Sequence, residues 1–106
     1  MQSLVDIYRN ALDVMRDGEG WTTEHLAQDD AFNEVHPKDA KACRFCISGA
    51  LLNAAPDVPC ATIALEFLRV EVLHNEAAIS MWNDSPARTW PEVRTLLLTA
   101  SCLAAA

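Results

Sequence analysis

The sequence predicts an all-α fold: a single compact helical bundle of four main helices plus a short helix, built from residues 1–106 as one domain. Three observations support this prediction. Apolar residues recur at the spacing of an amphipathic helix along most of the chain. Prolines and capping residues stand at the expected ends of these segments. Glycine is rare, with 3 among 106 residues, and a chain of this length can bury one core without disulfides.

The first helix is predicted from Ser3, a capping residue, to about Asp17. Gly18 supplies the left-handed conformation that commonly ends a helix. The opposite face of this helix is charged, as expected for a helix with one wet side. The inward stripe consists of Leu4, Tyr8, Ala11, Leu12 and Met15.

Residues 19–36 fit neither a long helix nor an alternating strand, because their apolar residues are spaced irregularly. We expect an irregular excursion across the bundle, held there by Trp21 and Phe32, with one helical turn beginning at Thr22 or Thr23. A connection of this length in a compact domain is more often functional than a short one.

A central helix is predicted from Lys38 to Ala55, with Pro37 in its first turn and Pro56 as its stop. Gly49 costs about 1 kcal/mol relative to alanine inside a helix, and a close crossing with a neighbouring helix would justify this cost. The apolar face consists mostly of small residues: Cys43, Cys46, Ile47, Ala50, Leu51 and Ala54.

Residues 60–74 form the next predicted helix, which is apolar on nearly all sides. A helix with so narrow a polar strip lies either at the centre of the bundle or at a subunit interface. A short helix follows at residues 76–82, and then a turn at residues 83–86, whose Asx, Ser and Pro residues favour it. The last helix begins at the capping box Thr89–Glu92.

Two blocks of the sequence resemble a known family. They are Cys-Arg-Phe-Cys-Ile-Ser-Gly-Ala-Leu-Leu-Asn-Ala at residues 43–54 and Met-Trp-Asn-Asp-Ser-Pro-Ala-Arg-Thr-Trp-Pro-Glu-Val-Arg-Thr-Leu-Leu at residues 81–97. Together they are similar to the DUF6197-type proteins, which are small uncharacterised proteins of bacteria and of phage or prophage genomes. The resemblance implies a shared fold and a phage-related origin, and it supplies no activity to carry over.

The net charge of −7 is concentrated in the first 40 residues, which carry nine acids against three bases. Direct binding to nucleic acid needs clustered Lys and Arg, so we do not expect it. An acidic surface favours a basic protein partner, including a nucleic-acid-binding protein whose phosphate site the carboxylates would imitate. The candidate partner-binding residues are Asp13, Asp17, Asp29, Asp30 and Glu34.

We expect no membrane span, because the longest nearly apolar run, residues 96–106, is too short to cross a bilayer. The N-terminus has no basic region ahead of an apolar one, so no secretory signal is expected either. A chain that builds its own core does not need disulfides, and we therefore expect reduced thiols and a cytoplasmic protein.

Cys43 and Cys46 form a CxxC pair, which can be half of a zinc site or a redox pair. A redox pair follows a strand and opens a helix, whereas Cys43 is expected well inside a helix. A zinc site would need two further ligands, and the sequence has no second close pair to supply them. We therefore interpret both thiols as core residues and the three histidines, His25, His36 and His74, as surface or capping residues.

The most distinctive polar cluster surrounds the predicted turn at residues 83–86. It could face a ligand, with Trp82 and Trp90 as an aromatic platform. In the structural interpretation, which we favour, the turn is ordered by its Asx side chains, Arg88 pairs with Asp84, and both tryptophans fill the core. The residues with predicted turn and capping roles are Asn83, Asp84, Arg88, Thr89 and Glu92.

No catalytic residue and no cofactor is predicted, because the chain lacks a nucleophile motif, a phosphate loop and a paired metal spacing. We expect a non-enzymatic protein-interaction module that self-associates, as a homodimer, through residues 60–74 or the last helix. Two alternatives stay open. One is an acidic mimic that binds a basic nucleic-acid-binding host protein; the other is a small metal-binding protein or enzyme that uses Cys43, Cys46 and a histidine.

Overall fold

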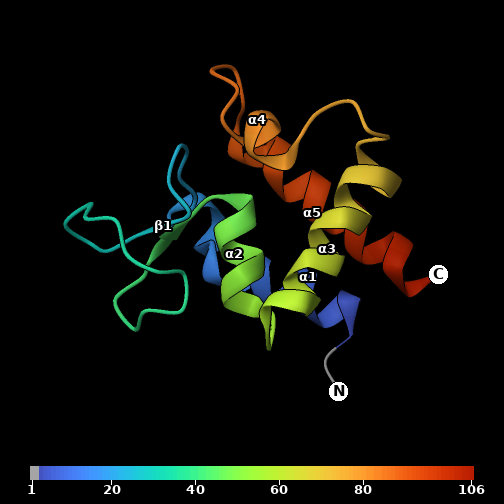
Figure 1. The fold of residues 1–106 in the computed structure, drawn as a ribbon. Helices are drawn as coiled ribbons and strands as arrows, with labels where there is room; N and C mark the ends of the chain where they lie inside the picture. Colours follow the sequence, from blue (N-terminus) through green and yellow to red (C-terminus); the bar gives the residue numbers. More distant parts are fainter. Residues whose placement is uncertain (1–2) are drawn as a thin grey trace.

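The computed structural model describes residues 3–106, and most of them lie in helices (Figure 1). The α-helices are α1 (Leu4–Val14), α2 (Ile47–Ala54), α3 (Val58–Phe67), α4 (Ile79–Asn83) and α5 (Trp90–Ala105). A 3₁₀ turn, η1 (Arg16–Gly18), follows α1, and a π-helical turn, η2 (Leu68–Val72), continues α3. The strands β1 (Ala27–Gln28) and β2 (Arg44–Phe45) pair into a small antiparallel sheet. The mainly helical class is therefore confirmed, and the sheet corrects the all-α prediction.

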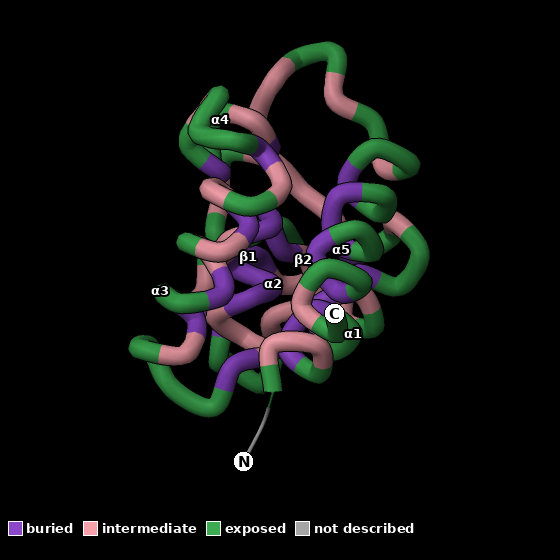
Figure 2. The backbone as a smooth tube through the Cα atoms, turned by 90° about the vertical axis from the view of Figure 1, so that its right-hand side faces the viewer, coloured by how far each residue is buried: buried purple, intermediate pink, exposed green. Residues whose placement is uncertain are grey.

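α1 is the element around which the other helices pack. It contacts α5 and α2 most extensively and touches α3 as well. Figure 2 shows the buried residues gathered through the middle of the molecule. The largest of them include Tyr8, Met15, Phe45, Ile47, Leu51, Leu68, Val93 and Leu97. Residues 20–46 project to one side of the helices as loops that carry the sheet (Figure 1).

α1 begins as predicted and ends earlier than predicted. The Ser3 hydroxyl accepts a hydrogen bond from the Asp6 N–H, and the Asp6 carboxylate accepts one from the Ser3 N–H, which completes a capping box. The helix stops short of Asp17, because Arg16 and Asp17 already have left-handed φ values of 47° and 55°, ahead of Gly18 at 102°.

Side-chain bonds to distant segments hold this left-handed turn. Non-glycine residues seldom adopt such φ values, so they need compensation from elsewhere. Arg16 Nη2 donates a hydrogen bond of 2.8 Å to the Cys43 carbonyl. Trp90 Nε1 donates one of 3.2 Å to the Asp17 carboxylate. The end of α1 is therefore set by tertiary contacts as well as by Gly18.

The helix predicted over residues 38–55 is wrong in its first half, since α2 begins only at Ile47. Polar side chains hold the preceding residues in turns. The His36 ring accepts a hydrogen bond from the Lys38 N–H, and the Asp39 carboxylate accepts one from the Lys41 N–H. The backbone of residues 43–45 pairs instead with that of residues 20–28.

The small sheet anchors the projecting loops. Ala27 of β1 lies opposite Phe45 of β2, and both residues are buried. Phe32 is 65% exposed, and its ring lies 4.0 Å from the Arg44 guanidinium carbon. The prediction that Phe32 holds this segment against the helices is therefore wrong, and Phe45 is the buried aromatic anchor.

α3 does not lie at the centre of the molecule. Its inner face packs on α1, where the Tyr8 hydroxyl donates a hydrogen bond of 2.6 Å to the Ala64 carbonyl. Its solvent side carries exposed apolar residues, Ile63 at 58% and Val58 at 65%, beside the polar Thr62 and Glu66. Two positions were predicted for this helix. The one at the centre of the bundle is wrong, and the one at a subunit interface stays a prediction.

The last two helices follow the predicted order. α4 was predicted at residues 76–82. It is shorter than that, since it begins only at Ile79 and ends at Asn83. α5 has 16 residues and starts after Thr89, whose N–H and hydroxyl both donate to the Glu92 carboxylate, at 2.9 and 3.0 Å. Within residues 3–106, no helix combines the length and the apolar composition that crossing a bilayer requires.

Gly49 lies in α2 at the point where the backbone of Leu26 comes closest. A Cβ atom at position 49 would lie 1.7 Å from the Leu26 carbonyl oxygen. Gly49→Ala should therefore lower the free energy of unfolding by about 3 kcal/mol, although alanine is the better helix former. Chemical denaturation measures this loss.

Ser48→Ala is the matched control in the same helix, because it removes an atom and adds none. It should change the free energy of unfolding by no more than about 0.5 kcal/mol. A Gly49→Ala variant as stable as the wild type would contradict the close approach of Leu26.

Candidate functional site

The Asn83 side chain is fully buried at the end of α4 and joins three segments of the chain. Its Oδ1 accepts hydrogen bonds from Trp21 Nε1 and from the Ile47 N–H, each 3.0 Å long. Its Nδ2 donates to the Thr22 carbonyl at 3.1 Å and to the Asp84 carboxylate at 2.9 Å. The donors and acceptors of the amide are therefore all used.

Asp84 extends this network to the loop before β1. Its Oδ1 accepts a hydrogen bond of 2.9 Å from the Glu24 N–H. Glu24 has a left-handed φ of 68°, so the bond supports a conformation that non-glycine residues seldom adopt. The helical turn predicted at Thr22 or Thr23 does not form, and residues 22–26 are held against α4 instead.

Cys46 is the N-cap of α2, and its Sγ accepts a hydrogen bond of 3.3 Å from the Gly49 N–H. The residue is 6% exposed. Burial raises the pKa of the thiol, and the negative charge of Asp84 adds to this effect, while the N–H groups of Gly49 and Ser48 oppose it. The thiol therefore stays protonated at neutral pH.

These segments enclose a hollow of about 210 Å³ at the start of α2, which we call the polar hollow. Its lining combines a thiol, an imidazole, two carboxylates and two hydroxyl groups. The lining residues are Glu24, His25, Leu26, Cys46, Ser48, Ser80 and Asp84. Polar groups of several chemical kinds thus converge on one small space.

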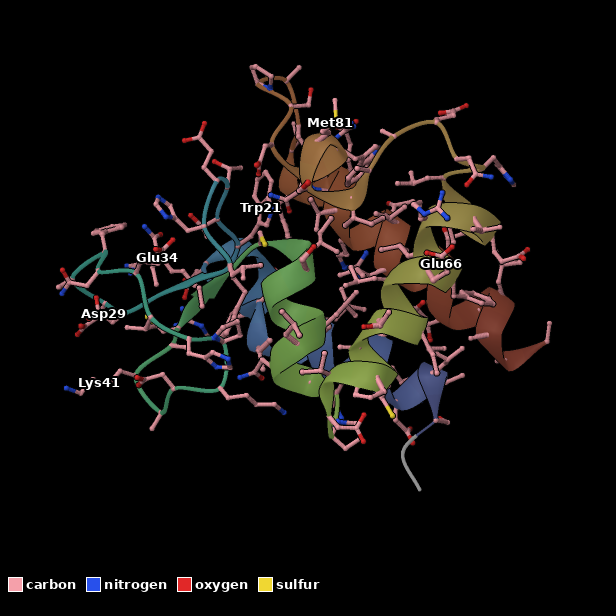
Figure 3. The ribbon with its side chains drawn as sticks, in the orientation of Figure 1. Trp21, Asp29, Glu34, Lys41, Glu66 and Met81 are labelled. Carbon is pink, nitrogen blue, oxygen red and sulfur yellow. The ribbon has the colours of Figure 1, made fainter. Side chains whose placement is uncertain are left out.

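His25 is held by Glu34, which lies on the projecting loops (Figure 3). His25 Nδ1 is 3.1 Å from Glu34 Oε1. A carboxylate only accepts hydrogen bonds, so the proton of the neutral ring is on Nδ1, and Nε2 carries the lone pair. His25 therefore lines the polar hollow with the lone pair of its neutral ring on Nε2.

The CxxC pair lies in a different setting from the one predicted. Cys43 is half-buried just before β2, and Cys46 opens α2, so the two do not share a helix. All four cysteines are free thiols. Among residues 3–106, no group of three or more His, Cys, Asp or Glu side chains is placed to hold a metal ion. The prediction that Cys43 lies well inside a helix is wrong, and the second thiol, Cys46, is the one that follows a strand and opens a helix.

Asp29, one of the predicted partner-binding residues, orders a turn of the projecting loops. Its carboxylate accepts hydrogen bonds from the N–H groups of Ala31 and Asn33 and from the Asn33 side chain. The Asn33 N–H is the largest of the effects that lower the pKa of this carboxyl group. Asp29 is therefore part of the loop structure.

The other predicted partner-binding residues are spread over two regions. Asp13 belongs to α1 and Asp17 to η1, while Asp30 and Glu34 lie on the projecting loops. Asp17, Asp29 and Glu34 already bond to other residues of the chain. A basic partner stays a prediction, with Asp13 and Asp30 as the members of the set that are left to meet it.

The structural interpretation predicted that Arg88 pairs with Asp84. This prediction is wrong, because Arg88 pairs with Glu92 instead. Its Nη1 donates to the Glu92 carboxylate at 3.0 Å, its Nε donates to the Trp82 carbonyl at 2.9 Å, and its guanidinium carbon lies 3.6 Å from the centre of the Trp82 ring. Asn83 bonds far beyond the turn. Arg88 thus bonds to nearby residues, whereas Asn83 joins distant segments.

The polar hollow was not predicted from the sequence. No spacing in the sequence connects His25 with Cys46, because the two line the same hollow only after residues 22–26 fold against α4. The roles of Asn83 and Asp84 in building the hollow leave no local signal either, since both fit an ordinary turn.

A family model described as a family of unknown function (DUF6197) matches residues 1–101 of the chain. The chain belongs to the DUF6197 family. The resemblance carried by residues 43–54 and 81–97 is therefore confirmed. No curated protein and no solved structure matches this DUF6197 chain.

Asn83→Ala should lower the free energy of unfolding of the DUF6197 chain by about 3 kcal/mol or more, since it leaves the buried Ile47 N–H and the half-buried Trp21 indole N–H without an acceptor. Urea denaturation measures the change. Asn10→Ala, on the exposed face of α1, is the matched control and should change stability by no more than about 0.5 kcal/mol. Equal stability of the two variants would contradict the central place of Asn83.

Glu92 makes part of the stability depend on pH. Hydrogen bonds from Thr89 lower the pKa of Glu92 most, and the charge of Arg88 lowers it further. A carboxylate with a lower pKa in the folded state stabilises that state above its unfolded pKa, and this contribution is lost as the pH falls through the folded value. The difference in melting temperature between wild type and Glu92→Gln should therefore be largest near neutral pH and shrink in acid. A constant difference would contradict this.

Proposed function

We propose that this DUF6197 chain is a protein-interaction module of the cytoplasm that forms a homodimer through the outer face of α3. The observation that carries the proposal is the exposure of Ile63, which is 58% open to solvent on an apolar helix face. The four free thiols fit a reducing compartment such as the cytoplasm.

The outer face of α3 and η2 carries a continuous apolar line, which we call the α3 seam: Cys60, Ile63, Phe67 and Val70. Ile63 lies between two shallow hollows. One, of about 330 Å³, is lined by Ile63, Glu66, Phe67, Val70 and Glu71. The other, of about 110 Å³, is lined by Leu4, Ile7, Cys60 and Ile63. A protruding apolar side chain thus stands beside recesses that could receive one.

The α3 seam is complementary to itself. Its residues are spaced three, four and three positions apart, so the spacing is the same in both directions. A two-fold axis that pairs two α3 helices antiparallel would set Ile63 against Phe67 of the partner subunit. It would also set Cys60 against Val70 of the partner subunit. The same patch then serves on both copies, as a two-fold dimer requires.

Charged residues border the α3 seam without entering it. Arg69 binds Glu66 in an ion pair on the same helix, and Glu71 is exposed beside it. An apolar centre with a polar rim is typical of protein–protein interfaces. Met81 lies on α4, away from Glu66 and the seam (Figure 3).

Ile63→Glu should convert the dimer to a monomer, because it places a carboxylate at the centre of the apolar contact. Sedimentation velocity or light scattering at micromolar concentrations measures the mass. Met81→Glu is the matched control, since Met81 is 71% exposed and lies outside the seam, and it should leave the dimer intact. A monomeric wild type, or equal dissociation of both variants, would contradict the proposal.

Cross-linking tests the antiparallel arrangement separately. Val70→Cys should form an intermolecular disulfide with Cys60 of the partner subunit under mild oxidation, because the proposed axis brings these positions together. Met81→Cys is the control and should give no such dimer. A dimeric wild type whose Val70→Cys variant does not cross-link would contradict this geometry.

A further inference from the structure

The polar hollow combines the parts that thiol chemistry requires. Cys46 supplies a nucleophilic group, His25 supplies a base, and both line the same space. The N–H of Gly49, in the first turn of α2, donates to the sulfur. None of these residues belongs to the α3 seam, so chemistry in the polar hollow does not depend on the dimer.

His25 has the hydrogen-bond partner expected of a general base. Glu34 accepts the Nδ1 proton in a hydrogen bond of 3.1 Å, so Nε2 is the ring nitrogen that can take a proton. A carboxylate behind an imidazole also stabilises the imidazolium that forms when the ring accepts a proton. Because the Cys46 thiol is protonated at rest, it needs a base before its sulfur can react.

We propose that Cys46 is a nucleophile that accepts an acyl group from a small ester or thioester bound in the polar hollow. His25 is its general base, and Glu34 is a positioning residue that acts through His25. The hollow, at about 210 Å³, is smaller than the roughly 300–1,000 Å³ of sites for drug-sized ligands, so short acyl groups fit it. Ser48 and Ser80 line it, and their hydroxyl groups can donate to the carbonyl oxygen as charge develops there.

The first half-reaction transfers the acyl group to the sulfur. His25 Nε2 takes the thiol proton as the sulfur electron pair attacks the carbonyl carbon. The tetrahedral intermediate then collapses, the bond to the leaving oxygen or sulfur breaks, and the imidazolium returns the proton to the leaving group.

The second half-reaction is hydrolysis along the same route. His25 takes a proton from water as the water oxygen adds to the thioester carbon. The carbon–sulfur bond then breaks, the carboxylic acid leaves, and the imidazolium returns the proton to Cys46. No redox partner is needed.

p-Nitrophenyl acetate tests the proposal, because the released nitrophenolate is followed by its absorbance. It should acetylate a single thiol per chain, and tandem mass spectrometry should place the acetyl group on Cys46. Cys46→Ser should stay folded, because serine is a good N-cap, and should lose the rapid reaction. Cys43→Ser, the neighbouring thiol variant, is the matched control and should keep the wild-type rate.

The pH dependence separates the role of the His25–Glu34 pair from folding. His25→Asn and Glu34→Gln should each slow acetylation at neutral pH by about 10²-fold, with circular dichroism unchanged. Both should recover at alkaline pH, where the thiol ionises without a base. Acetylation spread evenly over the four cysteines, or a wild-type rate for His25→Asn at neutral pH, would overturn the proposal.

Discussion

The buried amide of Asn83 is the interaction on which the arrangement of this chain depends. It bonds at once to residues 21–22, to the start of α2 and to Asp84. A buried polar group costs free energy unless its donors and acceptors are matched. Apolar burial alone would allow many relative placements of these segments. The amide favours the one placement in which every partner is present.

The same amide shapes the start of α2. The first N–H groups of a helix have no partner within it, and here Asn83 takes the Ile47 N–H while the Cys46 sulfur takes the Gly49 N–H. The sulfur therefore has a structural partner as well as a place in the polar hollow. Fold and candidate chemistry share these atoms, which is why Cys46→Ser separates them better than Cys46→Ala would.

Helix starts could be predicted from the sequence where the signal is local. Ser3 and Thr89 do begin helices, because capping is decided within one turn. The start of α2 could not be predicted, since residues 43–45 find their backbone partners only in residues 20–28, and such tertiary pairing overrides local preference. For the site, Asn83 was identified but its partners were not, because sequence spacing does not show which distant segments meet.

The π-helical turn η2 is a segment in which the chain tolerates insertions and deletions poorly. There the Leu73 N–H bonds to the Leu68 carbonyl, one residue further back than in an α-helix, so the turn accommodates an extra residue. Deleting that residue would rotate the next part of the chain by about 100° and carry the buried Leu73 out of the core. The exposed residues 39–41 have no such constraint, so evolution can lengthen or shorten the projecting loops far more freely than this helix.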